Sequence, residues 1–178
     1  MNNINNNIIL IGFMGSGKTS VGRKLALKLD YEFFDTDLLI EANEGITIND
    51  IFKNSGEEYF RELESKLLHK LRTSLNHAVL STGGGMPLRE QNGQLLKELG
   101  FVVYLEASCE TTLNRLKGDS TRPLLQGNDL ATKISSILEL RRPIYKNIAH
   151  IMMDTDDRSL DDIAETIINS YSDYCNHE

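Results

Sequence analysis

The sequence predicts an α/β fold, a three-layer α-β-α sandwich built around a five-stranded parallel sheet. Five short apolar runs alternate with segments whose apolar residues recur at helical spacing. This alternation is typical of parallel strands joined by right-handed crossover helices that cover both faces of the sheet. The 178 residues are enough for one domain with a single core, and too few for a second domain of ordinary size.

The first strand and the first helix are the most clearly marked elements. Residues 8–11 form a continuous apolar run closed by a glycine, as expected of a strand buried on both faces. Over residues 17–29 the period changes, and Val21 and Leu25 recur at helical spacing. The order is therefore strand, glycine loop, helix.

The next elements are a strand that ends in acids and two helical segments. Residues 31–34 read as the second strand, and residues 38–42 turn helical. Thr47, with an acid three residues later, resembles a helix start, and an amphipathic helix is expected over residues 56–72.

The second half of the chain continues the alternation. Strands are expected at 78–81, 101–105 and 151–153, and helices at 88–99, 111–116, 130–148 and 160–171. The polar stretch 117–129 has the length and glycine content of a lid loop. Residues 1–6 are expected to form a flexible tip, and the tail after residue 171 is expected to fray.

Composition excludes several classes of partner. Nineteen Lys and Arg against 26 Asp and Glu give a formal charge of −7, which disfavours nucleic acid and anionic membranes as partners. The two cysteines and four histidines are scattered, without zinc or disulfide spacing. No apolar stretch has the length of an export signal or a membrane span, so a cytoplasmic protein is expected. The chain is also expected to be a monomer.

The strongest chemical signal is the segment 12–19, which matches G-x-x-x-x-G-K-[ST] between a strand and a helix. Backbone N–H groups of such a loop bind phosphate oxygens, Lys18 reaches the β- and γ-phosphates, and Thr19 offers a hydroxyl to Mg²⁺. The predicted cofactors are ATP, as co-substrate, and Mg²⁺. The candidate nucleotide-binding residues in and directly after this segment are Gly12, Gly15, Ser16, Gly17, Lys18, Thr19 and Ser20.

The loop alone leaves open a GTPase, a pump or motor ATPase, and a small-molecule kinase. No N-K-x-D guanine-reading segment occurs, and the third strand ends in glycines rather than in a Walker-B acid. Asp35 and Asp37 stand at a strand end, where one acid can hold Mg²⁺ through water and the other can orient or deprotonate an attacking hydroxyl. These observations favour a kinase.

Arginines at three places indicate the charge of the acceptor. Arg61 has Glu64 one helical turn later, Arg141 precedes a proline in a long helix, and Arg122 lies in the expected lid. Arginines that converge on one cleft can grip a carboxylate bidentately, so the acceptor is expected to be an acid.

Taken in order, these motifs resemble the shikimate kinase family over most of the chain. They are residues 12–19, Phe33-Phe34-Asp35-Thr36-Asp37, Ile51-Phe52, Gly56-Glu57, Phe60-Arg61 with Glu64, Thr82-Gly83-Gly84-Gly85, Arg122-Pro123-Leu124-Leu125 and Arg141-Arg142-Pro143-Ile144-Tyr145. The resemblance implies a fold similar to nucleoside monophosphate kinases, with strand order 2-3-1-4-5. It also implies a shikimate-binding region over about residues 37–72 and a mobile lid.

The resemblance also implies roles for particular residues. Lys18, Asp37 and Arg122 would be catalytic, with Asp37 the base or orienting group, and Thr19 and Asp35 would hold Mg²⁺. Shikimate would contact Asp37, Arg61, Gly83, Gly84, Gly85 and Arg141, while Arg115, Arg122 and Arg158 would contact ATP. Met86-Pro87, after the glycines, departs from the small residues expected there and would alter the edge of the pocket.

The implied reaction converts ATP and shikimate to ADP and 3-phosphoshikimate, a step of aromatic amino-acid biosynthesis. A gluconate kinase shares the loop and an acidic sugar acceptor, but lacks the Phe60-Arg61 pair and the Arg141-x-Pro-x-Tyr pattern. A regulatory module that binds ATP without transferring phosphate is the alternative from another class.

Overall fold

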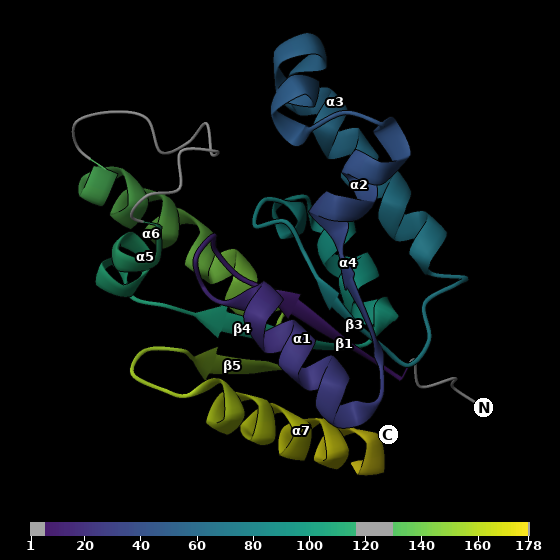
Figure 1. Ribbon diagram of the computed structural model, residues 1–178, viewed down its shortest axis with the longest axis vertical. Helices are drawn as coiled ribbons and strands as arrows, with labels where there is room; N and C mark the ends of the chain where they lie inside the picture. Colours follow the sequence, from purple (N-terminus) through teal and green to yellow (C-terminus); the bar gives the residue numbers. More distant parts are fainter. Residues whose placement is uncertain (1–5, 117–129, 178) are drawn as a thin grey trace.

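The computed structural model describes residues 6–116 and 130–177, and its centre is a parallel sheet with helices on both faces (Figure 1). The strands β1 (Asn7–Ile11), β2 (Glu32–Asp35), β3 (Ala78–Ser81), β4 (Phe101–Glu106) and β5 (Ile151–Asp154) lie in the order β2-β3-β1-β4-β5. Every neighbouring pair is parallel. The predicted fold class and strand order are confirmed. The predicted lid, with Arg122, lies outside the described residues, as do residues 1–5.

Helices connect the successive strands, and one more helix follows the last strand. They are α1 (Lys18–Leu29), α2 (Thr36–Glu44), α3 (Ile48–Leu71), α4 (Glu90–Leu99), α5 (Cys109–Leu116), α6 (Leu130–Ile148), α7 (Leu160–His177) and the short 3₁₀ turn η1 (Met86–Leu88). None of the helices within the described residues is long and apolar enough to cross a membrane.

Several helix boundaries differ from the sequence prediction, among them those of α2, α3 and α7. The helix α2 begins at Thr36 because the Asp35 carboxylate caps it, accepting a hydrogen bond from the backbone N–H of Asp37. In α3, two helical pieces join at Gly56, whose φ of 82° and ψ of 173° are not helical. Instead of fraying after residue 171, α7 continues to His177, and its Tyr174 ring packs 4.9 Å from the Phe101 ring.

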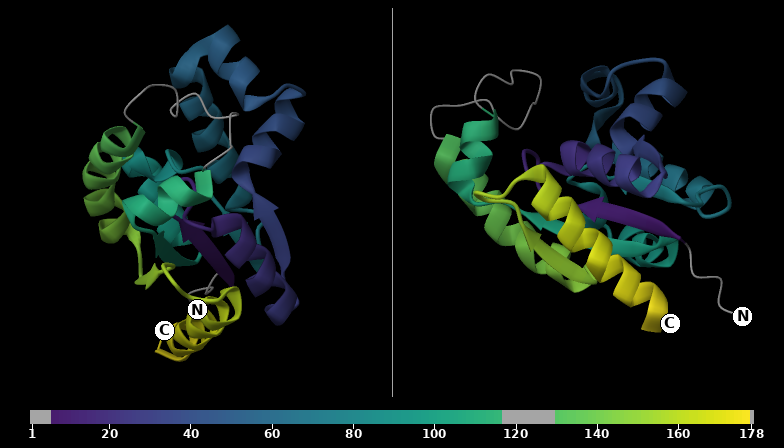
Figure 2. Two further views of the ribbon diagram at one scale, coloured as in Figure 1. Left: turned by 60° about the vertical axis from the view of Figure 1, so that its left-hand side comes forward. Right: turned by 60° about the horizontal axis from the view of Figure 1, so that its bottom comes forward.

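Each face of the sheet buries its own hydrophobic cluster because alternate strand residues point to opposite sides. On β1, Ile9 and Ile11 belong to the cluster shared with α3, α4 and α6. Ile8 and Leu10 belong to the cluster shared with α1 and α7. Figure 2 shows α7 alongside α1, with α4 and α6 across the sheet from them. The three-layer arrangement follows directly.

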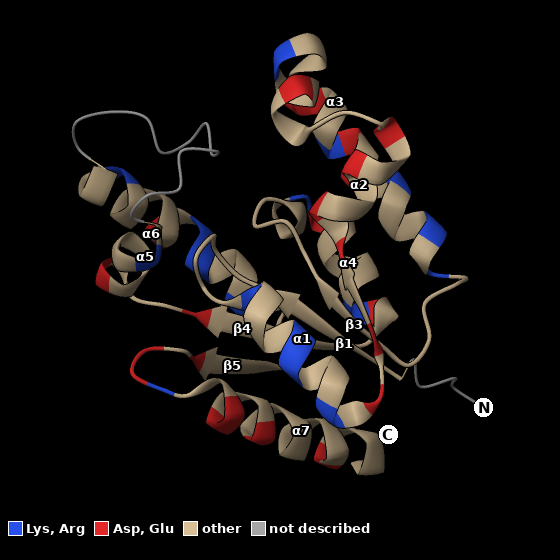
Figure 3. Cartoon of the chain, viewed as in Figure 1, with Lys and Arg blue, Asp and Glu red and all other residues tan. Residues whose placement is uncertain are grey.

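Two lysines of α1 form ion pairs with acids of α7. Lys24 and Lys28 both approach Asp161, at 2.8 Å and 3.3 Å, and Lys28 also lies 3.0 Å from Glu165. Figure 3 shows these basic and acidic segments facing each other across the two helices. Ion pairs between exposed side chains contribute little to stability, so they hold α7 only weakly against α1.

Candidate active site

The carboxyl ends of β1, β2 and β3 bring three chain segments together. These are the glycine loop 12–17, the Asp35–Asp37 segment and the glycine turn 82–85. They form two adjoining cavities, of about 340 Å³ and about 440 Å³. The walls of both cavities contain Met14, Asp37, Gly83 and Gly84. A group bound in one cavity therefore lies next to a group bound in the other.

The smaller cavity, called here the phosphate cavity, is built on the glycine loop. Gly15 and Gly17 adopt φ of 75° and 92°, the left-handed region that favours glycine, and α1 begins at Lys18. The backbone N–H groups of a helix N-terminus are free to bind an anion, and the helix dipole favours negative charge there. This arrangement suits a polyphosphate.

Most of the residues predicted to bind the nucleotide and Mg²⁺ lie in the wall of the phosphate cavity. Its wall contains the predicted residues Gly15, Gly17, Lys18, Thr19, Ser20, Asp35, Asp37, Gly83, Gly84 and Arg115. The Lys18 ammonium donates to the carbonyls of Gly12 and Phe13, at 2.9 Å and 2.7 Å. Gly12 and Ser16 lie behind the wall: a Cβ on Gly12 would meet the Leu105 carbonyl, and Ser16 is buried. Their contribution is the shape of the loop.

Thr19 and Asp35 present oxygen ligands side by side in this wall. The Thr19 hydroxyl donates to the Asp35 carboxylate at 3.2 Å, and the other carboxylate oxygen caps α2. Hydroxyl and carboxylate oxygens beside a phosphate site are the ligands that Mg²⁺ prefers in nucleotide-binding proteins. The two residues fit the role that the sequence predicted for them.

The larger cavity, called here the acceptor cavity, lies between α2, α3, the glycine turn and α6. Apolar side chains form much of its wall, with Phe52 and Phe60 from α3 and Leu38 from α2. Arg61 and Arg141, which are 80 positions apart in the chain, both line it. The Arg141 guanidinium also lies over the Phe13 ring, 5.7 Å from its centroid. The structure thus brings together the two arginines whose convergence the sequence could only suggest.

Two acids hold Arg61 at the acceptor cavity. Its guanidinium donates to Glu64 and to Glu57, both at 2.8 Å. Glu64 is fully buried, and its Oε1 atom has no hydrogen-bond partner among the described residues. Burial raises the pKa of Glu64 to about 7, and the nearby Asp37 carboxylate acts in the same direction, while Arg61 opposes the rise. The cavity therefore contains a carboxyl group that titrates near neutral pH.

We expect Glu64 to make the free energy of unfolding depend on pH between about 4.5 and about 7. A raised acid pKa means that the folded protein keeps a proton that the unfolded chain releases, so stability falls as pH rises across this window. The full cost above pH 7 is about 3 kcal/mol. Glu64→Gln keeps an acceptor for Arg61 and removes the titration. Measured by urea unfolding, the decrease in the free energy of unfolding from pH 5 to pH 8 should be smaller in this variant than in the wild type.

Glu62→Gln provides the matched control because Glu62 is on the same helix, is 53% exposed and pairs loosely with Lys66 at 3.9 Å. Its loss of stability between the two pH values should equal that of the wild type. Equal losses in the wild type and in Glu64→Gln would show that Glu64 titrates in its ordinary range.

The glycine turn leaves no room for side chains. A Cβ on Gly83 would lie 2.5 Å from Asp37 Oδ1 and 3.2 Å from Glu64 Oε1, and a Cβ on Gly85 would collide with the Arg61 guanidinium. Glycine at these positions allows the acids and Arg61 to reach the cavity. Met86, which the sequence placed at the pocket edge, points instead into the core and is fully buried.

Hydrogen bonds with the Thr36 and Tyr145 hydroxyls hold the turn from two sides, and the sequence analysis identified neither side chain for this role. The backbone N–H of Gly83 donates to the Thr36 hydroxyl at 2.9 Å. The carbonyl of Gly84 accepts from the Tyr145 hydroxyl at 2.6 Å and from Arg141 at 3.5 Å. Burial raises the pKa of Tyr145 to about 12, so the phenol remains a donor at neutral pH. Thr36 and Tyr145 are inside recognised motifs, but spacing alone does not reveal these bonds.

The remaining predicted arginines differ in placement. Arg115 lies at the phosphate cavity, where it donates to the carbonyls of Gly15 at 3.1 Å and Thr155 at 2.9 Å. Arg158, by contrast, donates to Asp162 at 2.6 Å and to Thr166 at 2.9 Å along α7. Within the described part of the chain, Arg158 belongs to the wall of neither cavity.

A phosphate-binding glycine loop at the carboxyl edge of a 2-3-1-4-5 parallel sheet, beside a cavity with an acid and two arginines, defines a P-loop kinase of the nucleoside monophosphate kinase-like fold. The family model described as shikimate kinase matches residues 14–172. The shikimate kinase of Symbiobacterium thermophilum is 44% identical over 164 residues, which cover 91% of this chain and 94% of that protein. The chain belongs to the shikimate kinase family.

Solved structures agree with this assignment. Shikimate kinase from Acinetobacter baumannii in complex with shikimate is 40% identical, with a TM-score of 0.87 and coverage of 94% of this chain and 92% of that chain. The structure of shikimate kinase from Aquifex aeolicus is 35% identical, with a TM-score of 0.81 and coverage of 95% of this chain and 98% of that chain. The family resemblance read from the sequence is confirmed.

Proposed function

We propose that the chain transfers the γ-phosphate of ATP to the 3-hydroxyl of shikimate, giving ADP and 3-phosphoshikimate. The observation that carries this proposal is that the phosphate cavity and the acceptor cavity share Asp37, with Gly83 and Gly84, in their walls. A nucleotide in one cavity and a hydroxyl in the other would meet at a carboxylate. Family membership supports the identity of the acceptor.

The acceptor cavity has the charges that a hydroxylated acid requires. Arg61 and Arg141 would hold the carboxylate of shikimate, since a guanidinium binds a carboxylate with two parallel hydrogen bonds. The rings of Phe52 and Phe60 provide apolar surface for the carbon ring. Asp37 would accept a hydrogen bond from the reacting hydroxyl and take its proton as the phosphoryl group moves. The glycine turn leaves the space that the acceptor fills.

The protein forms no covalent bond to the transferred phosphoryl group, so its rate enhancement comes mostly from positioning the reactants and stabilising the charge of the transition state. Lys18 would contact the β- and γ-phosphates, and the α1 N-terminus would bind their oxygens. Thr19 and Asp35 would hold Mg²⁺, which supplies positive charge to the phosphates when bound. Arg122 is proposed to reach the phosphates from the lid, and Arg115 to lie beside the adenine.

We also propose that the enzyme acts as a monomer in the cytoplasm. Sedimentation at assay concentration would test the first part: a mass near 20.1 kDa supports it, and a dimer contradicts it.

The decisive experiment is ADP release from Mg·ATP with shikimate, gluconate, a nucleoside monophosphate or no acceptor. Shikimate-dependent turnover well above the other three reactions is expected. Turnover with gluconate or a nucleotide instead would agree with the assignment of the phosphate cavity but contradict shikimate as the acceptor. Tight ATP binding without turnover would favour a regulatory module.

A further inference from the structure

A buried amide lies under the glycine turn, outside both cavities. Asn92 on α4 is fully buried, and its Nδ2 donates to the carbonyl of Met86 at 3.1 Å. Its Oδ1 accepts a hydrogen bond from the Ser65 hydroxyl at 2.9 Å. An amide in a hydrophobic core is costly unless its hydrogen bonds are made. Both functional ends of this amide are used.

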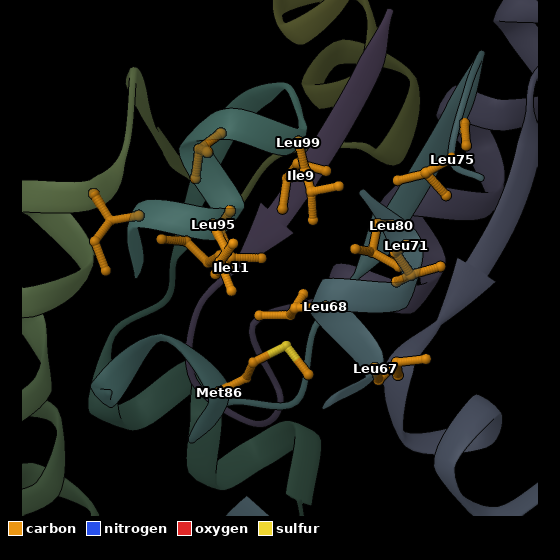
Figure 4. Close-up of a cluster of buried hydrophobic side chains, with 14 of the residues drawn as sticks. Ile9, Ile11, Leu67, Leu68, Leu71, Leu75, Leu80, Met86, Leu95 and Leu99 are labelled. Carbon is orange, nitrogen blue, oxygen red and sulfur yellow. The ribbon is translucent and has the colours of Figure 1, made fainter. Parts of the chain in front are cut away.

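The first of these bonds fixes the end of the turn. The backbone N–H of Met86 donates to the carbonyl of Gly83 at 3.1 Å, which closes the turn, and Asn92 then holds the carbonyl of the same residue. The Met86 side chain points toward Leu68 within the hydrophobic cluster (Figure 4). The turn is therefore anchored to α4 through a hydrogen bond and to the core through packing.

The second bond connects this anchor to the helix that carries Arg61. Ser65 is one turn after Arg61 on α3, and its hydroxyl lies 3.1 Å from the Arg61 carbonyl as well as 2.9 Å from Asn92. The turn also contacts the Arg61 guanidinium directly, since a Cβ on Gly85 would collide with it. A shift of α3 relative to the turn would therefore move Arg61 in the acceptor cavity.

We propose that Asn92 and Ser65 are positioning residues for the acceptor. Together they set the distance between α3 and the glycine turn, and so hold Arg61 where it meets the acceptor carboxylate. Tyr145 holds the same turn at Gly84 from α6, the helix of Arg141. Both helices that carry an arginine of the acceptor cavity are thus connected to the turn, α6 through Tyr145 and α3 through Ser65 and Asn92. This inference rests on the proposed role of Arg61.

The test is a pair of variants measured for both substrates. Asn92→Leu keeps a similar volume and removes both hydrogen bonds, and the KM for shikimate should rise about tenfold, with the KM for ATP within about twofold of the wild type. Ser65→Ala removes only the connection to α3 and should raise the KM for shikimate about threefold. The double variant should be no worse than Asn92→Leu, because both changes break one chain of bonds.

Asn7→Leu is the matched control for stability. Asn7 is equally buried and also donates to backbone carbonyls, those of Leu75 at 3.3 Å and Leu99 at 2.8 Å. It lies at the start of β1, at the opposite end of the sheet from the site. Its variant should lower the melting temperature with both KM values unchanged.

The outcomes separate the inference from its alternatives. An unchanged KM for shikimate in both Asn92→Leu and Ser65→Ala would overturn it. Equal rises of the KM for shikimate and the KM for ATP, together with a lower melting temperature, would overturn it as well. If Asn92→Leu does not fold, Ser65→Ala decides the question alone, since its side chain is only partly buried. Failure of the wild type to turn over shikimate would instead refute the proposed function.

Discussion

Asp37→Asn is expected to lower kcat by a factor of about 10² to 10⁴, with little change in ATP binding. Asp37 is in the wall shared by the two cavities, where the attacking hydroxyl must lie. An asparagine keeps the size of the side chain and can accept a hydrogen bond, but it cannot take up the proton. The backbone N–H of residue 37 still donates to Asp35, so the start of α2 is preserved. Steady-state kinetics with shikimate varied, and calorimetric titration with ADP, measure the two effects separately.

Asp173→Asn is the control for the change in charge, because Asp173 is exposed on α7. It should leave kcat and both KM values at wild-type levels. An Asp37→Asn variant with kcat within threefold of the wild type would remove Asp37 from the role of base, and a lost affinity for ADP would indicate damage to the phosphate cavity.

Arg61→Ala should raise the KM for shikimate about 100-fold, equivalent to about 3 kcal/mol, while the KM for ATP stays near the wild-type value. Two losses combine in this variant. The acceptor carboxylate loses a charged partner, and the buried Glu64 loses the cation that opposes the rise in its pKa. An unpaired buried carboxylate is costly, so the fall in stability between pH 5 and pH 8 should be larger in this variant than in the wild type.

Arg72→Ala is the control at the end of the same helix, because Arg72 directly follows α3, is 51% exposed and pairs with Glu98 at 3.3 Å. It should leave the KM for shikimate unchanged. If folded Arg61→Ala protein has a wild-type KM for shikimate at pH 7, then Arg61 does not bind the acceptor. The positioning roles proposed for Asn92 and Ser65 would then be contradicted as well.

The parts predicted well from the sequence are those whose signal is local. The segment 12–19 encodes a phosphate site because its glycines, lysine and threonine act within a few residues of one another. The strands were visible as short apolar runs because parallel strands are buried on both faces. Helix boundaries were less accurate at Gly56 and after residue 171, where a non-helical glycine and the packing of Tyr174 on Phe101 decide the outcome.

Periodicity and spacing report neighbours along the chain, and so they determined the fold class, the phosphate site and the acids at the end of β2. Burial and charge environment depend on residues brought together from distant segments, so only the tertiary structure could decide them. It placed Arg61 and Arg141 in one cavity, and it turned Arg158 toward α7. It also buried Glu64 beside Asp37, because α3 packs that face against the glycine turn, and this desolvation raises its pKa to about 7.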